Sequence, residues 1–95
     1  MKALAEITVI PLGVGTSVRK EVKRAHKVLQ DSGLTVELHA YGTNVEGELT
    51  AILKAVETMH EVLHAEGAPR LVTTIKLGTR TDKEPSLAGK LFPTD

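Results

Sequence analysis

The sequence predicts an α+β domain in which two helices cover one face of a four-stranded antiparallel sheet. Two stretches have apolar residues three and four positions apart, the spacing of amphipathic helices. Four other segments alternate apolar and polar residues or are rich in β-branched residues, as strands are. Their order is strand, helix, strand, short strand, helix, strand. Because each strand–helix–strand half must cross over in the right-handed sense, this order predicts a ferredoxin-like βαββαβ plait.

Each predicted element ends at turn-forming or capping residues. The first helix has Ser17 as its predicted N-cap and Gly33 as its stop, and Gly67 and Pro69 end the second. Thr43 and Glu46 fit a T-x-x-E capping box for the second helix, although the same side chains could also bind a ligand. The predicted elements are a strand at Ala3–Pro11, a helix at about 17–32, a strand at Leu34–Tyr41, a short strand at Thr43–Val45, a helix from Leu49 to about Glu66 and a strand at Arg70–Leu77.

The 95 residues allow one domain, 1–95, whose tail after about residue 82 is expected to be irregular. Twelve Lys and Arg balance twelve Asp and Glu, so the basic excess of a nucleic-acid binder is missing. The chain has no cysteine, which excludes disulfides and thiolate chemistry, and no cofactor is expected. No apolar run has the length of a membrane span and no signal peptide is recognisable, so we expect a cytoplasmic protein without a membrane partner.

Strand alternation divides the predicted sheet into two faces. The helix-facing set contains Ala5, Ile7, Val9, Val36, Leu38, Leu71, Ile75 and Leu77. The opposite face mixes polar and apolar residues: Glu6, Thr8, Ile10, Glu37, His39, Tyr41, Val72, Thr74 and Lys76. Two interpretations follow. The face is a solvated sheet surface, or it packs on a second copy of the chain, shelters its apolar residues and encloses a polar ligand site.

His60 to His64 match H-E-x-x-H, the helical zinc motif. The helical spacing places both histidines on the core-facing flank and Glu61 on the outward side, and no further His follows His64 as a third ligand. We therefore interpret them as histidines at a packing boundary and expect no metal site. His26 has a similar position on the first helix.

Two other patterns give weaker evidence for a binding or catalytic role. Gly13 to Ser17 follow a strand and open a helix, so their N–H groups could hold an anion, but the segment lacks the Lys of a P-loop and the third Gly of G-x-G-x-x-G. Ser17, His39 and Glu46 supply the residue types of a triad, but no G-x-S-x-G elbow is present. We expect no catalytic residues and no enzymatic activity.

The sequence resembles the small thiamine-binding proteins related to the YkoF-like domains over residues 2 to 91. The resemblance lies in Val9-Ile10-Pro11-Leu12-Gly13, in the G-T-x-x-E-G at 42–47, in Thr73-Thr74-Ile75-Lys76 with Arg80 close behind, and in Lys90. It departs from the family at Gly78-Thr79, where acidic residues are usual, and at Tyr41, where Met is usual. The C-terminal helix of the family is also cut short after Lys90.

This resemblance implies a ferredoxin-like plait that forms dimers and tetramers through its sheets and binds thiamine or a related pyrimidine. Thiamine is a cation with an aminopyrimidine, so its site needs a carboxylate, hydroxyls or amides, and an apolar or aromatic wall. The expected ligand-binding residues are Glu6, Thr8, Ser17, His39, Tyr41, Thr43, Asn44 and Glu46. Two alternatives remain: a structural or regulatory homo-oligomer without a ligand, and a small-molecule enzyme that uses His39 and Glu46 as acid and base.

Overall fold

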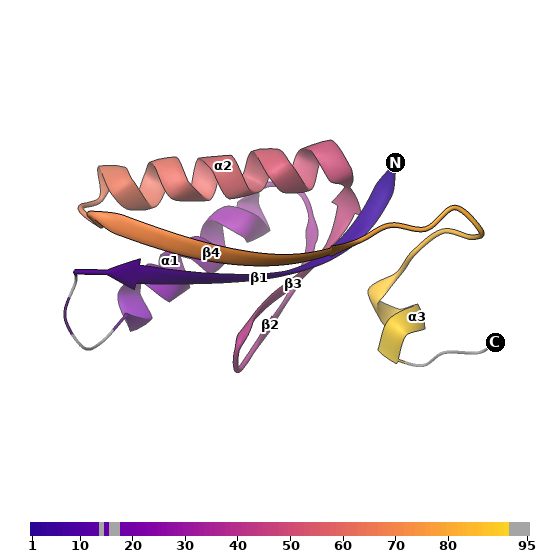
Figure 1. Cartoon of the computed structure of the whole chain (residues 1–95), viewed down its shortest axis with the longest axis horizontal. Helices are drawn as coiled ribbons and strands as arrows, with labels where there is room; N and C mark the ends of the chain where they lie inside the picture. Colours follow the sequence, from indigo (N-terminus) through magenta and orange to yellow (C-terminus); the bar gives the residue numbers. More distant parts are fainter. Residues whose placement is uncertain (14, 16–17, 92–95) are drawn as a thin grey trace.

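A computed structural model describes residues 1–13, 15 and 18–91, with the side chain of residue 91 left aside. Strands and helices alternate in the predicted order, and a short third helix follows them (Figure 1). The elements are β1 (Lys2–Leu12), α1 (Arg19–Asp31), β2 (Thr35–His39), β3 (Gly42–Glu48), α2 (Leu49–Ala65), β4 (Arg70–Gly78) and α3 (Leu87–Leu91). The predicted N-cap Ser17 lies outside the described residues.

The four strands form one sheet in the order β2-β3-β1-β4, and every neighbouring pair is antiparallel. This order, with the first and third strands in the centre, is that of the ferredoxin-like plait. The predicted fold is therefore confirmed. The register opposes Ala5 to Val45 on one side and to Leu77 on the other, so the apolar positions of the central strands share one face.

That face carries the core, because α1 and α2 pack against it and remove its apolar side chains from water. Figure 1 shows α2 along one side of β1 and β4, with α3 on the opposite side near the start of β1. Leu29, Ile52, Met59 and Leu63 are the largest fully buried helix residues. Along β1 the helix-facing residues are Ala3, Ala5, Ile7, Val9 and Pro11, all buried.

Both main helices end as predicted, at glycines in the left-handed region. Gly33 has a φ of 83° and Gly67 a φ of 109°, values that side chains with a Cβ rarely adopt. The N-terminal capping prediction for α2 is wrong. Thr43 lies inside β3, α2 begins at Leu49, and its N-cap Glu48 makes no side-chain capping bond.

Three other differences concern the β2–β3 hairpin and the tail. The predicted short strand is seven residues long, because pairing with both β1 and β2 extends it. Tyr41 is in the two-residue turn between β2 and β3, beyond the end of the strand at His39. The tail, expected to be irregular, contains α3, which packs on β3.

None of the described helices combines the length and apolar character needed to cross a bilayer.

Candidate ligand site

The face of the sheet opposite α1 and α2, the open face, carries a row of polar residues that crosses all four strands. The register opposes Glu37 of β2 to Asn44 of β3, Asn44 to Glu6 of β1, and Glu6 to Lys76 of β4. Directly opposed residues have Cβ atoms about 4.5–5.5 Å apart, so their polar ends can bind one ligand together. The four strands thus place two carboxylates, one amide and one ammonium in line.

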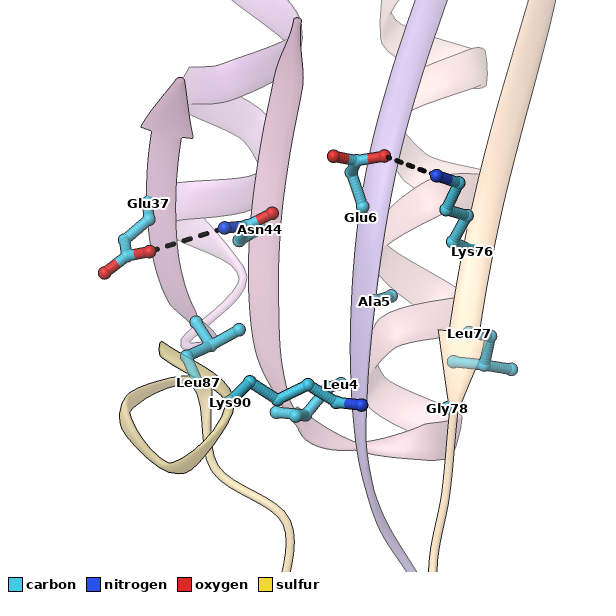
Figure 2. Close-up of a pocket in the computed structure, with 10 residues that line it drawn as sticks. All are labelled: Leu4, Ala5, Glu6, Glu37, Asn44, Lys76, Leu77, Gly78, Leu87 and Lys90. Atoms are coloured by element: carbon cyan, nitrogen blue, oxygen red, sulfur yellow. Dashed lines mark hydrogen bonds and ion pairs between the residues drawn. The ribbon is translucent and has the colours of Figure 1, made fainter. Parts of the chain in front are cut away.

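The row is linked by hydrogen bonds and ion pairs (Figure 2). Asn44 Nδ2 donates to Glu37 Oε1 at 3.4 Å, and Lys76 Nζ lies 3.9 Å from Glu6 Oε1. Figure 2 shows the first pair on β2 and β3 and the second on β1 and β4. Lys76 and Glu37 are exposed and Glu6 and Asn44 are half-buried, so a ligand could replace these weak contacts with its own at little cost.

His39 connects Asn44 to Glu6. Its Nε2 lies 3.1 Å from Asn44 Oδ1 and 3.3 Å from Glu6 Oε2, while the Tyr41 backbone N–H donates to its Nδ1. Since Nδ1 accepts and Nε2 faces two acceptor oxygens, the network assigns a neutral imidazole with its proton on Nε2. The ring therefore fixes the orientation of the Asn44 amide, whose NH₂ group is turned toward Glu37.

A cavity of about 380 Å³ lies over the row, within the size range of small-molecule sites. The polar residues form one part of its lining, and Leu4 and Leu87 supply an apolar part. Leu4 is buried even though alternation places it on the open face, because the tail covers it. The cavity is lined by Leu4, Ala5, Glu6, Glu37, Asn44, Lys76, Leu77, Gly78, Leu87 and Lys90.

Glycine is required at the end of this face where the hairpin starts. A Cβ on Gly42 would lie 2.8 Å from Thr8 Oγ1 and 2.9 Å from the Ile7 carbonyl oxygen. Both distances are too short for carbon, so β3 approaches β1 this closely only with glycine. Thr8 donates from Oγ1 to the Tyr41 carbonyl at 2.9 Å, which ties the turn to β1.

The structure brings together only part of the predicted site. Glu6, His39 and Asn44 form the network, and Thr8 and Tyr41 lie next to it at the turn, with Tyr41 85% exposed. Thr43 points to the opposite, helix-covered face and is buried, so it cannot reach a ligand on the open face. Ser17 lies outside the described residues.

Glu46 is on the open face but is engaged by the tail. Its Oε1 accepts a hydrogen bond from the Leu87 backbone N–H at 2.8 Å, and its Oε2 lies 3.6 Å from Lys2 Nζ. Glu46 thus anchors α3, which in turn supplies Leu87 and Lys90 to the cavity. Its role in the structure is to position other lining residues.

Of the ten lining residues, two, Glu6 and Asn44, were among the expected ligand-binding residues. Strand alternation placed Lys76 on the open face without assigning it to the site, and Leu4 could have been found in the same way, since it shares the open-face register of Glu6. Lys90 entered through the family resemblance alone and Leu87 not at all, because no local pattern indicates that the tail folds back onto the sheet. Glu37 was placed on the open face but was not among the expected ligand-binding residues.

The histidines of the H-E-x-x-H segment lie on the other side of the molecule and make local contacts. His60 Nε2 lies 2.6 Å from Thr73 Oγ1 of β4, and His64 Nδ1 lies 2.7 Å from the Ala68 carbonyl. Among the described residues, no three His, Cys, Asp or Glu side chains gather as metal ligands would.

Comparison with known sequences shows the family. The model of the family described as "Thiamine-binding protein" matches residues 5–93. This chain belongs to that family. The UPF0045 protein sll0230 of Synechocystis is 43% identical over 91 residues, which cover 96% of this chain and 75% of that protein.

Two solved structures have the same fold as this thiamine-binding family member. MJ1052 of Methanocaldococcus jannaschii superposes with a TM-score of 0.88 at 42% identity, covering 95% of this chain and 92% of that one. TM0486 of Thermotoga maritima, described as a candidate thiamine biosynthesis/salvage protein, gives a TM-score of 0.85 at 22% identity, covering 96% of both chains. At that identity, the second likeness shows the fold alone.

Proposed function

We propose that this protein binds thiamine, or its hydroxymethylpyrimidine moiety, on the open face and does not catalyse a reaction on it. The observation that carries the proposal is the row Glu37–Asn44–Glu6 along a cavity with leucine walls. Membership of a family described as thiamine-binding supports the choice of ligand. The proposed binding takes place in the cytoplasm, in keeping with a cysteine-free composition.

The chemistry of the ligand suits this row. An aminopyrimidine offers an exocyclic amine as donor and ring nitrogens as acceptors, and the Asn44 amide can both accept and donate. The carboxylates of Glu6 and Glu37 accept from the amine and attract the thiazolium cation, and charge-assisted bonds of this kind are about twice as strong as neutral ones. Leu4 and Leu87 offer apolar area to the ring faces.

Calorimetric titration with thiamine tests this proposal. We expect Glu6→Gln to weaken thiamine binding about tenfold, since it keeps the shape of the side chain but removes a charge facing the cation. The uncharged hydroxymethylpyrimidine should lose less affinity than thiamine in the same variant. Glu57→Gln is the matched control, because Glu57 lies on the exposed side of α2, paired with Lys54.

Wild-type protein that gives no heat with thiamine or with hydroxymethylpyrimidine at millimolar concentrations does not perform this function. Equal losses of thiamine affinity in Glu6→Gln and Glu57→Gln would show that Glu6 does not contact the ligand and that the ligand binds outside the open-face cavity.

We also propose that the chain forms a homo-oligomer, a dimer or a tetramer, through the open face. Ile10 and Val72 are directly opposed on β1 and β4, and they are 47% and 49% exposed. A second copy packed there would remove both side chains from water and would close the cavity from outside. Binding of the ligand and assembly would then use one surface.

A further inference from the structure

The side-chain amide of Asn44 is held at both ends by its neighbours on β2. Its Nδ2 donates to Glu37 Oε1 at 3.4 Å, and an ionised carboxylate can only accept there. Its Oδ1 lies 3.1 Å from His39 Nε2, the ring nitrogen that carries the proton. Figure 2 shows the amide nitrogen turned toward Glu37 and the amide oxygen turned toward β1.

The proton on His39 Nε2 is set by the backbone of the turn between β2 and β3. The Tyr41 N–H donates to His39 Nδ1 at 3.3 Å, and a backbone N–H can only donate. Nδ1 therefore accepts, so Nε2 is the donor of the neutral ring. An Asn44 amide turned over would point its NH₂ group at this donor and its oxygen at the Glu37 carboxylate. Both hydrogen bonds would be lost, so the amide is held in one orientation.

A second acceptor lies next to the Asn44 oxygen. Glu6 is directly opposed to Asn44 across β1 and β3, and its Oε2 lies 3.3 Å from the same His39 Nε2. The other oxygen of Glu6, Oε1, faces Lys76 on β4 at 3.9 Å. One N–H group thus gathers Asn44 Oδ1 and Glu6 Oε2 around it. Asn44 and Glu6 line the cavity of about 380 Å³, whereas His39 does not.

Two neighbouring acceptors select a ligand group that donates. An exocyclic NH₂ group has one hydrogen for each of the two oxygens, and the second hydrogen on Asn44 Nδ2 suits the adjacent ring nitrogen, which accepts. Asn reads the amine and ring nitrogen of adenine through the same bidentate pattern. A carbonyl oxygen in the place of the amine would face two acceptors, one of them charged, and the adjacent ring N–H would face the Asn44 NH₂ group.

We infer that His39 is a positioning residue that makes the site select aminopyrimidines against oxopyrimidines. This selectivity rests on the proposed function and specifies which pyrimidine ring the site accepts. His39 acts through Asn44, because it keeps the oxygen and the nitrogen of that amide in one order. The Tyr41 N–H acts one step further back, since it fixes the His39 tautomer.

Calorimetric titration with thiamine and with oxythiamine tests this selectivity. Oxythiamine has a carbonyl oxygen in place of the exocyclic amine and a proton on the adjacent ring nitrogen. We expect wild-type protein to bind thiamine about thirtyfold tighter than oxythiamine, the effect of two ordinary hydrogen bonds. In His39→Leu the Asn44 amide is free to turn over, so the preference should fall to about threefold or less.

Two further variants separate positioning from a general effect on the fold. In His39→Gln a side-chain NH₂ group can replace Nε2–H, since Asn44 and Glu6 both offer oxygens there, and most of the preference should return. His60→Leu makes the same change at another half-buried histidine, on α2, where it contacts Thr73, and it should keep the full preference. Circular dichroism checks that each variant is folded.

The wild-type affinities separate this inference from the proposed function. Equal affinities for thiamine and oxythiamine, or an undiminished preference in His39→Leu, overturn the inference and leave thiamine binding intact. A preference that falls as far in His39→Gln or in His60→Leu as in His39→Leu also overturns it, since the donor at Nε2 would then not be the cause. Wild-type protein that binds neither compound contradicts both proposals.

Discussion

At the scale of single residues, the face of β3 on which a side chain lies decides its part in the site. Asn44 and Thr43 are neighbours in the sequence, yet Asn44 lines the cavity and Thr43 is buried beneath the helices. The alternation of strand side chains causes this separation. The Asn44 amide also depends on His39, which accepts and donates in one fixed tautomer.

Substitutions of Asn44 and Thr43 test whether the two faces of β3 differ in their contribution to ligand binding. Asn44→Ala should weaken thiamine binding at least tenfold, because it removes a donor and an acceptor and leaves Glu37 and His39 without their shared partner. Thr43→Val removes a hydroxyl on the helix-covered face and keeps the β-branched shape, so it should leave the affinity within about twofold. The measurement is titration with thiamine, after circular dichroism has shown that both variants fold. A larger loss in Thr43→Val would place the ligand on the other face.

At the scale of elements, α3 is the piece on which the site depends most. It has only five residues and is held to the sheet by Glu46, whose carboxylate accepts from the Leu87 N–H. In return it covers Leu4 and supplies Leu87 and Lys90 to the cavity. The Glu46 carboxylate on β3 does not line the cavity, but it holds in place the helix that supplies two of the lining residues.

Removal of this anchor should detach α3 while the sheet stays folded. A hydrogen bond to a charged group contributes about 1.5–3 kcal/mol, more than a five-residue helix can replace from its own structure. In Glu46→Ala we expect faster hydrogen exchange at residues 86–91, with β1 and β4 still protected. Glu48→Ala is the control, because Glu48 pairs with the terminal amine at the surface. Unchanged protection of the tail in Glu46→Ala would contradict this role.

The elements were largely predictable from the sequence, and the site only in part. Periodicity and the glycines at 33 and 67 predicted both main helices, and alternation assigned Glu6 and His39 to the open face. The capping-box prediction failed because Thr43 pairs with residues of both neighbouring strands, β1 and β2, and this pairing keeps it in β3. The folding back of the tail depends on a contact between Glu46 and Leu87, forty-one positions apart, which no local pattern encodes.

At the scale of the whole molecule, two helices cover one sheet face, and within residues 1–13, 15 and 18–91 the other face has only α3 at one end. The uncovered part contains the opposed pair Ile10 and Val72, with the exposed ring of Tyr41 at the neighbouring turn. A chain of 95 residues buries a limited share of its surface alone, so a second copy adds burial that its own core cannot provide.

The proposed assembly gives a direct prediction. Val72→Asp should convert the oligomer to smaller species, because a carboxylate would lose its hydration at the centre of the interface. Native mass spectrometry reports the number of subunits and any retained ligand in one measurement. Leu53→Asp is the control, since Leu53 is 49% exposed but lies on α2, away from the open face. A wild-type protein that is monomeric at micromolar concentration would contradict the prediction.

The docking of α3 has a consequence for the thermodynamics of binding. A helix of one turn is not stable by itself, so its order is an equilibrium between a docked and a detached tail. A ligand that contacts Leu87 and Lys90 binds the docked form better and must shift this equilibrium toward it. The measured affinity is therefore the intrinsic affinity multiplied by the docked fraction. Residues that never touch the ligand, such as Lys2 and Glu46, can in this way set how tightly it is held.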